Sequence, residues 1–305
     1  MASRAVFITG ATGKQGGAVI NALLRENAPF EILALTRNAQ SSSAQKLAQK
    51  SPRIKLITGN MDAIEDAFQK SKEATRLPIW GVFSVQVPMG DGQSSKSEER
   101  QGKALVDAAL QNGVQHFVYS SVDRHGSKSD TNPTNIPHFL SKHNIEQHLF
   151  ATAKRSEMDW TVLRPVAFYE NLMPGFFGKV FATSFEMSLR EDQKLQMVAT
   201  SDIGDFAARA FINPEEYKNK SISLAGDELT FSEFKRTFEE TTGQSLPKTT
   251  TLIAKPLHWM AKELGYMFKW FRDVGYAADI QSLRKINPDL KTFKTWLQTE
   301  SAWRK

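Results

Sequence analysis

The chain has 305 residues, 40% of them hydrophobic and 24% charged, which is ordinary for a globular protein with a sizeable core. It contains no cysteine, so disulfides, thiolate catalysis and cysteine-ligated zinc are excluded. The net charge of +6 comes from the segment after residue 243, which is compatible with a solvated lysine-rich surface or with steering of an anionic ligand.

No apolar run approaches the roughly 18 residues of a membrane helix, so no membrane partner is expected. The first strand-like run follows the N-terminus too closely for a cleavable signal. No stretch interleaves aromatic residues with Arg and Lys, so direct nucleic-acid binding is not expected either. These features predict a cytoplasmic protein, or one also present in the nucleus.

Short apolar runs alternate with amphipathic helix-like stretches over the first half of the chain. This alternation is typical of βαβ units and predicts an α/β fold with a doubly wound parallel sheet of the Rossmann type. The predicted strands are Ala5–Thr9, Ile32–Thr36, Ile54–Thr58, Trp80–Val85, His116–Ser120 and Trp160–Leu163.

The alternation loosens after Pro165, where helical patterns predominate and strand-like pieces such as Ser221–Leu224 are isolated. We therefore predict a Rossmann domain over residues 1–165. Residues 166–305 form a smaller, mostly helical lobe that closes a cleft, with some strands returning to the main sheet.

Three glycines follow the first predicted strand at G-x-x-G-x-x-G spacing: Gly10, Gly13 and Gly16. In a βαβ context such glycines permit a tight turn, close approach of the backbone to a ligand and close packing of helix on strand. The N–H groups and dipole of the following helix favour a pyrophosphate. The turn predicts dinucleotide binding, and a purely structural turn is the alternative.

The end of the second strand indicates which dinucleotide is bound. NAD sites usually place an acidic residue there, on the ribose 2′-hydroxyl. Here the strand ends in Arg37, and the nearby acid Glu31 lies at the strand's other end. A guanidinium at this position can form a forked contact with a 2′-phosphate, which favours NADP(H). If Arg37 is instead a surface arginine without a ligand, it does not recognise the ribose 2′ position.

Several segments together resemble the NmrA-like family of atypical short-chain dehydrogenases. They are "TGATGKQGG", "VYSSVDRHG", "HFLSKHNIEQHL", "RPVAFYENL", "SLAGDELTFSEF" and "NPDLKTFKTWL", and they extend over nearly the whole chain. The resemblance implies a Rossmann domain, a small C-terminal lobe and a ligand cleft between them. That cleft would take a small-molecule substrate or a protein partner.

By the same resemblance, a series of residues just past strand ends would line the cofactor. In order from the phosphates through the 2′-phosphate, adenine and ribose to the nicotinamide, they are Thr12, Gly13, Lys14, Gln15, Arg37, Asn60, Met61, Ser84, Gln86, Pro165, Val166 and Phe168, with Tyr169 and Asn171 close by.

The catalytic pattern of short-chain dehydrogenases is incomplete in this chain. The usual set is Ser, Tyr and Lys, with Tyr and Lys at Y-x-x-x-K spacing on one helix face. The chain keeps Ser120 or Ser121 and Lys142, but His138 stands at the tyrosine position.

Three alternatives follow from this departure. His138 can act as the acid, since imidazole titrates near neutrality. Lys142 can act alone, as the resemblance to plant ether and isoflavone reductases implies. In the third alternative Lys142 only anchors the cofactor, and the protein is a dinucleotide sensor with weak or no turnover, like the regulators of the family.

Overall fold

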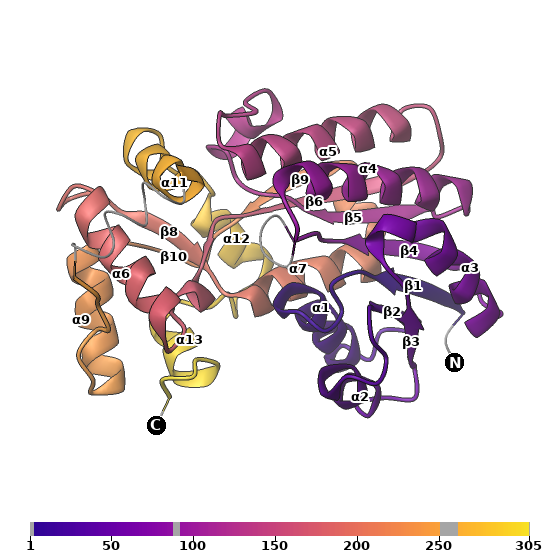
Figure 1. Cartoon of the computed structure of the whole chain (residues 1–305), viewed down its shortest axis with the longest axis horizontal. Helices are drawn as coiled ribbons and strands as arrows, with labels where there is room; N and C mark the ends of the chain where they lie inside the picture. The colour runs from indigo at the N-terminus through magenta and orange to yellow at the C-terminus, as the bar shows by residue number, and fades with distance from the viewer. Residues whose placement is uncertain (1–2, 88–91, 251–261, 305) are drawn as a thin grey trace. The chain divides into compact units, whose positions relative to one another are not determined.

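A computed structural model of the chain describes residues 3–87, 92–250 and 262–304. The chain forms two compact units, each built from several segments (Figure 1). Unit 1 comprises Met1–Ser121, His138–Arg164 and Ile203–Ile222, and unit 2 comprises Val122–Pro137, Pro165–Asp202 and Ser223–Lys305. The single domain boundary after residue 165 stays a prediction.

Within the described residues, unit 1 is organised around a seven-stranded sheet in the order β3-β2-β1-β4-β5-β6-β9. Neighbouring strands from β3 to β6 pair in parallel, so the order 3-2-1-4-5-6 is that of a doubly wound Rossmann fold. All six predicted strands are confirmed to within two residues at each end, and the run at Ser221–Leu224 becomes β9. The strands are β1 Arg4–Ile8, β2 Phe30–Thr36, β3 Ile54–Thr58, β4 Ile79–Ser84, β5 His116–Ser120, β6 Asp159–Pro165 and β9 Lys220–Leu224.

Helices cover both faces of this sheet because successive strand side chains point to opposite faces (Figure 1). Phe7 of β1 stacks on Phe68 with ring centroids 5.0 Å apart. On the other face, a Cβ at Gly81 of β4 would lie 2.9 Å from the ring of Phe211. The helices on the Phe68 face are α3 Ile64–Ala74, α4 Ser95–Gln111 and α5 Pro137–Ala153; those on the Phe211 face include α1 Lys14–Arg25 and α7 Thr200–Ile212.

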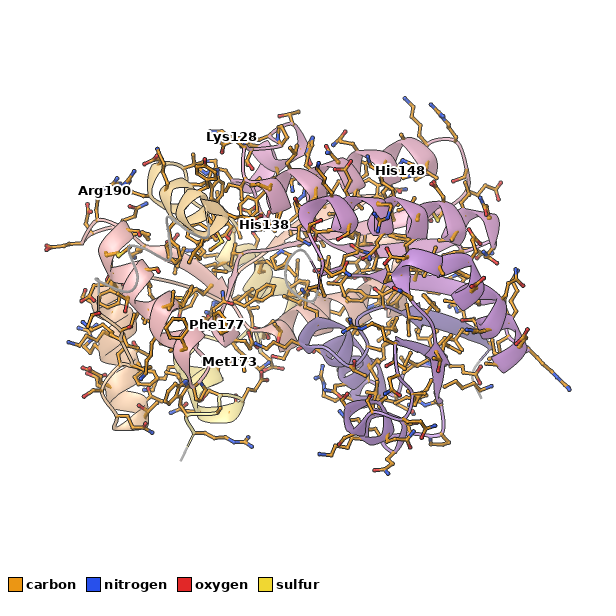
Figure 2. All side chains as sticks on the ribbon, in the orientation of Figure 1. Lys128, His138, His148, Met173, Phe177 and Arg190 are labelled. Atoms are coloured by element: carbon orange, nitrogen blue, oxygen red, sulfur yellow. The ribbon has the colours of Figure 1, made fainter. Side chains whose placement is uncertain are left out.

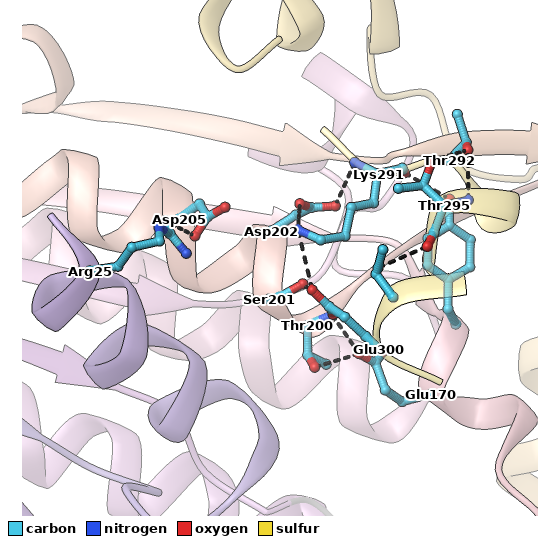
Figure 3. Close-up of polar contacts among 12 residues, drawn as sticks. Arg25, Glu170, Thr200, Ser201, Asp202, Asp205, Lys291, Thr292, Thr295 and Glu300 are labelled. Carbon is cyan, nitrogen blue, oxygen red and sulfur yellow. Dashed lines mark hydrogen bonds and ion pairs between the residues drawn. The ribbon is translucent and has the colours of Figure 1, made fainter. Parts of the chain in front are cut away.

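Two glycines set how closely the helices of unit 1 approach. A Cβ at Gly102 of α4 would lie 2.4 Å from Ile145 of α5, and one at Gly204 of α7 would lie 2.5 Å from the backbone of Ala18 in α1. An ion pair of 2.7 Å between Arg25 and Asp205 also joins α1 and α7 (Figure 3). Two short helices, α2 Ser42–Ala48 and α8 Pro214–Tyr217, and the turn at Met61–Ala63 complete the unit.

Unit 2 contains a three-stranded sheet in the order β10-β8-β7. Its core is aromatic: Phe234 stacks on Phe293 at 4.4 Å, and Phe185 packs against Phe234 at 5.5 Å. The buried carboxylate of Asp202 accepts hydrogen bonds from the backbone N–H and Nζ of Lys291 (Figure 3). The elements of the unit are β7 Ala167–Phe168, β8 Leu195–Val198, β10 Asp227–Leu229, the turns Gly126–Asp130 and Tyr169–Leu172, α6 Phe176–Ser188, α9 Phe231–Thr242, α11 Lys262–Asp273, α12 Ile280–Ile286 and α13 Phe293–Thr299.

A search of the described part of the chain finds no helix that is both long enough and apolar enough to span a bilayer. The same residues contain no group of three or more His, Asp or Glu side chains placed to hold a metal ion.

His116 is buried at the beginning of β5, and its ring lies on the face of the sheet that Phe211 covers. Its ring stacks on Trp80 at 5.8 Å, and Nε2 lies 3.0 Å from the Thr161 hydroxyl. That hydroxyl donates to the Tyr217 carbonyl, so it accepts from Nε2–H of His116. Burial lowers the pKa of His116 from 6.5 to about 4, against the weaker opposing fields of Asp159 and Glu215.

We expect the free energy of unfolding to fall as the pH drops from 6.5 to about 4. A histidine whose folded pKa is depressed stabilises the fold above its unfolded pKa, and this contribution is lost as the unfolded state takes up the proton. The loss attributable to His116 is on the order of 3 kcal/mol. In His116→Gln the protein is less stable at pH 7, but this part of the pH dependence disappears. Urea unfolding at several pH values measures the stability and its pH dependence. If the free energy of unfolding changes equally with pH in the two proteins, the assignment to His116 is contradicted.

Candidate dinucleotide site

The turn between β1 and α1 is built on glycine backbone geometry. Gly10 has φ +59°, in the left-handed region that favours glycine. A Cβ at Gly16 would lie 2.4 Å from the Gly10 carbonyl oxygen and 2.6 Å from that of Thr9, so the first turn of α1 rests directly on the strand end. The N-cap Gly13 has no side chain with which to cap the helix.

The buried Thr9 side chain ties this turn to the end of β4. Its hydroxyl lies 3.1 Å from the Phe83 carbonyl and 3.0 Å from the Val85 carbonyl, and it accepts the Val85 N–H at 2.8 Å. The carboxyl ends of β1 and β4 are therefore held together, next to the glycine turn. Open α/β sheets bind their ligands at this edge.

A pocket of about 270 Å³ opens at the carboxyl ends of β1 to β4. It brings together seven of the predicted cofactor residues: Gly10, Thr12, Gly13, Arg37, Asn60, Met61 and Gln86. Sequence reasoning missed the other lining residues, which are Leu35, Thr36, Gly59, Val85, Val87, Gln93 and Gln101. Most of these are apolar or glycine residues whose pattern fits a strand end equally well.

The pocket presents an acceptor that is ready for a ligand. Gln86 is 5% exposed, and its Nε2 donates to the Ser84 hydroxyl at 2.8 Å. Its Oε1 is buried and has no hydrogen-bond partner among the described residues. A buried polar atom without a partner is costly, and a ligand hydroxyl would satisfy it. Ser84 itself is fully buried and does not line the pocket.

Arg37 is exposed and lies directly after β2, on the pocket wall. Glu31 lies at the beginning of β2 and forms an ion pair of 3.0 Å with Lys55 of β3. The carboxylate is thus at the opposite end of the strand from the pocket, as the sequence predicts. The charged side chain that β2 contributes to the pocket is cationic.

A polar network beside Asn60 and Met61 closes the pocket. Asp62 accepts from Arg100 at 2.7 Å and from Gln101 at 2.9 Å, and Gln101 also donates to Gln93 at 3.0 Å. The hydrogen bond from Arg100, followed by the one from Gln101, lowers the pKa of Asp62. These α4 side chains fix the shape of the pocket on the side where the resemblance implies adenine.

The two candidate serines at the end of β5 differ in their partners. The Ser120 hydroxyl donates to Gln15 Oε1 at 2.5 Å, which joins two predicted site residues. The Ser121 hydroxyl donates to the buried carboxylate of Glu146, which also binds Arg164 at 2.7 Å. Ser121 therefore belongs to a buried ionic network between α5 and the sheet.

Lys142 lies on α5, one turn after His138, which the sequence spacing predicts (Figure 2 labels His138). Its Nζ is 2.8 Å from the carboxylate of Glu98 on α4, a fully buried residue that sequence reasoning missed. His138 is half-buried, and its ring packs against Phe139 at 4.7 Å. Neither Lys142 nor Lys14, Gln15 or Gly16 lines the pocket beside Arg37.

The remaining predicted residues belong to unit 2. Pro165 ends β6, and the buried Val166 donates its N–H to the Leu224 carbonyl at 3.1 Å. Phe168 ends β7, and Asn171 is exposed in the following turn. Tyr169 is fully buried between Phe293 and Trp296, and burial raises its pKa well above 10. Its phenol is a core group of unit 2.

A doubly wound parallel sheet with a glycine turn after β1 and a pocket at the strand ends defines a Rossmann-type nucleotide-binding fold. The chain belongs to the NmrA-like family, whose model matches residues 2–297.

The proteins to which this chain is similar include some named as oxidoreductases or reductases and one named as a transcriptional regulator. The NmrA-like family domain-containing oxidoreductase hkm9 of Aspergillus hancockii is 30% identical over 262 residues, which cover 79% of this chain and 73% of the relative. The structure of Citrobacter sp. triphenylmethane reductase complexed with NADP(H) is similar, with a TM-score of 0.73 and 19% identity over 96% of this chain and 99% of that one. NmrA, a negative transcriptional regulator in complex with NADP, has a TM-score of 0.68 and 16% identity over 98% and 96% of the two chains.

The glycine turn generates a paired prediction on adjacent residues. In Gly16→Ala the new Cβ meets backbone at 2.4 Å, so we expect a loss of about 1–3 kcal/mol in the free energy of unfolding. In Gly17→Ala the nearest backbone atom is an ordinary 3.4 Å away, and the change should be neutral or stabilise α1 by up to about 1 kcal/mol. Urea denaturation of the two variants tests this, and equal stabilities would show that the turn tolerates a side chain at both positions.

Proposed function

We propose that this protein binds NADP(H) at the edge of the unit 1 sheet and acts as a dinucleotide sensor with weak or no turnover. The observation that carries the proposal is that the glycine turn, Arg37 and Gln86 line one pocket, while His138 stands where short-chain dehydrogenases have a tyrosine phenol. The glycine turn, the cationic wall at Arg37 and the unpartnered Gln86 oxygen fit a phosphorylated dinucleotide. When bound, the cofactor would supply a nicotinamide ring capable of carrying a hydride.

Different residues of the chain would bind different parts of the cofactor. The first-turn N–H groups of α1 receive the pyrophosphate, and Arg37 pairs with the 2′-phosphate. Asn60 and Met61 flank the adenine, while Gln86 and Lys142 hold the ribose next to the nicotinamide.

Arg37→Ala should remove most of a preference for NADP(H) over NAD(H). A guanidinium–phosphate contact contributes on the order of 1.5–3 kcal/mol, which corresponds to roughly 10- to 150-fold in affinity. NAD(H) affinity should be nearly unchanged, because NAD(H) has no 2′-phosphate. Calorimetric titration with both dinucleotides measures this. Arg76→Ala is the matched control, since Arg76 is an exposed arginine that precedes β4 at the other end of the sheet. Equal affinity of the intact protein for the two dinucleotides would refute the assignment of Arg37.

Weak turnover follows from the partners of the candidate catalytic groups. The Ser121 hydroxyl donates to Glu146 and the Ser120 hydroxyl donates to Gln15, while His138 stands one turn before Lys142 where a phenol is expected. Tyr169 is a buried core residue and does not substitute for the absent phenol. Replacement of a positioned acid by an ill-matched one typically costs about 10²–10⁴-fold in rate, whereas cofactor binding does not need that acid.

The second candidate is an NADPH-dependent reductase of a small carbonyl, quinone or enone substrate. It is favoured by the placement of His138 and Lys142 one turn apart on α5, which is the spacing of a proton donor and its lysine. The oxidoreductase names of the relatives and the triphenylmethane reductase structure support the same candidate. Its proton would come from His138 or from Lys142.

One pair of measurements distinguishes the dinucleotide sensor from the NADPH-dependent reductase. For a sensor, NADP⁺ and NADPH must stabilise different states, since a ligand with equal affinity for both states shifts nothing. We expect hydrogen exchange in 86–97, in 123–135 or in the C-terminal region to differ between the two cofactor forms; of these residues, 88–91, 251–261 and 305 lie outside the described ones. Stopped-flow oxidation of NADPH against quinones, aldehydes and enones should stay below about 1 s⁻¹. Identical exchange together with faster turnover that is lost in Lys142→Ala would establish the reductase.

A further inference from the structure

We infer that Glu98 is the positioning residue for Lys142: its buried carboxylate lies against the lysine ammonium and aims it for the nicotinamide ribose. This inference rests on the proposed NADP(H) binding and assigns a role to a residue of α4 that carries no recognisable motif. It concerns contacts within unit 1 alone.

Glu98 is brought to Lys142 by the close approach of α4 and α5. Gly102 lies one turn after Glu98. Because it has no side chain, Ile145 of α5 packs so closely that a Cβ at position 102 would clash with it. Ile145 lies one turn after Ser141 and Lys142. The same approach therefore places the Glu98 carboxylate against both residues, at 2.5 Å from the Ser141 hydroxyl and 2.8 Å from Lys142 Nζ.

The two oxygens of this carboxylate have different partners. Oε2 accepts the Ser141 hydroxyl, which fixes the plane of the group. Oε1 lies beside Lys142 Nζ but forms no hydrogen bond of ordinary geometry with the described residues. Its attraction for the lysine is thus that of a charge, and a slight rotation of the ammonium would add a hydrogen bond.

A carboxylate that is completely buried is expensive unless a cation compensates it, and Lys142 is itself only 8% exposed. Each charge therefore keeps the other in place. An ammonium has three N–H donors. With Nζ held 2.8 Å from the Glu98 carboxylate, the ammonium is in place before the cofactor arrives and keeps N–H donors for ribose hydroxyls. Such preorganisation lowers the ordering cost of binding.

The test uses two ligands and the full-length protein. NADP⁺ carries the nicotinamide riboside, whereas adenosine 2′,5′-bisphosphate keeps the adenosine and the 2′-phosphate and lacks that riboside. We expect Glu98→Gln to weaken NADP⁺ binding roughly ten-fold or more, the scale of one charge-assisted hydrogen bond, and to leave the affinity for the bisphosphate unchanged. A merely structural role would weaken both ligands together.

Glu99→Gln is the matched control, one position further along the same helix. Glu99 also pairs with a lysine, Lys103, and accepts a hydrogen bond from Asn144 of α5. The same chemical change there should alter neither affinity, because these partners lie outside the proposed ribose contact.

Lys142→Met separates failure of this inference from failure of the proposed function. It should show the same selective loss of NADP⁺, and the double variant should lose little more than either single one while regaining stability, since no unpaired buried charge is left. If the intact protein binds neither ligand, the proposed function fails and this inference with it. Suppose that Lys142→Met selectively loses affinity for NADP⁺. If Glu98→Gln then keeps its affinity for NADP⁺, or loses affinity for both ligands, the role of Glu98 alone is overturned.

Discussion

The carboxyl edge of the unit 1 sheet depends on one steric constraint, the contact between Gly16 and the backbone of Thr9 and Gly10. Because no side chain stands at position 16, α1 begins directly on the end of β1. Because Gly10 takes a left-handed φ, the chain turns there without leaving the sheet edge. The Thr9 hydroxyl then joins this turn to β4 through Val85. Pocket, helix terminus and strand ends are thereby held in one arrangement before any ligand binds.

Local signals in the sequence predict the scaffold of this edge well. The alternating apolar runs give the strands to within two residues, since burial between two helix layers demands continuous hydrophobic strands. The glycine spacing locates the turn, and residues that follow directly on strands, such as Arg37 and Gln86, line the pocket. In each case the signal and the structure lie within a few residues of each other.

The residues that sequence reasoning missed depend on contacts between distant segments. Glu98 lies in the run SKSEER, which has the composition of a solvated helix face, yet it is fully buried. Its burial results from an approach of α4 and α5 that Gly102 and Ile145 permit, 43 residues apart in the chain. Gln93 and Gln101 line the pocket through a hydrogen bond between them and one from Gln101 to Asp62, 39 residues earlier in the chain. The burial of Tyr169 in the aromatic core of unit 2 likewise requires Phe293 and Trp296, more than a hundred residues later.

The composition of unit 1 from three separate segments has a consequence for synthesis on the ribosome. Strands β1 to β6 emerge first, but Phe211 of α7 follows 46 residues after the end of β6. Until it arrives, Trp80 and Phe30 on that face of the sheet lack a cover that they have in the finished protein. The nascent chain therefore carries an open apolar sheet face while the intervening residues are translated. Chaperone binding during this interval would protect it, since exposed hydrophobic surface makes such intermediates prone to aggregation.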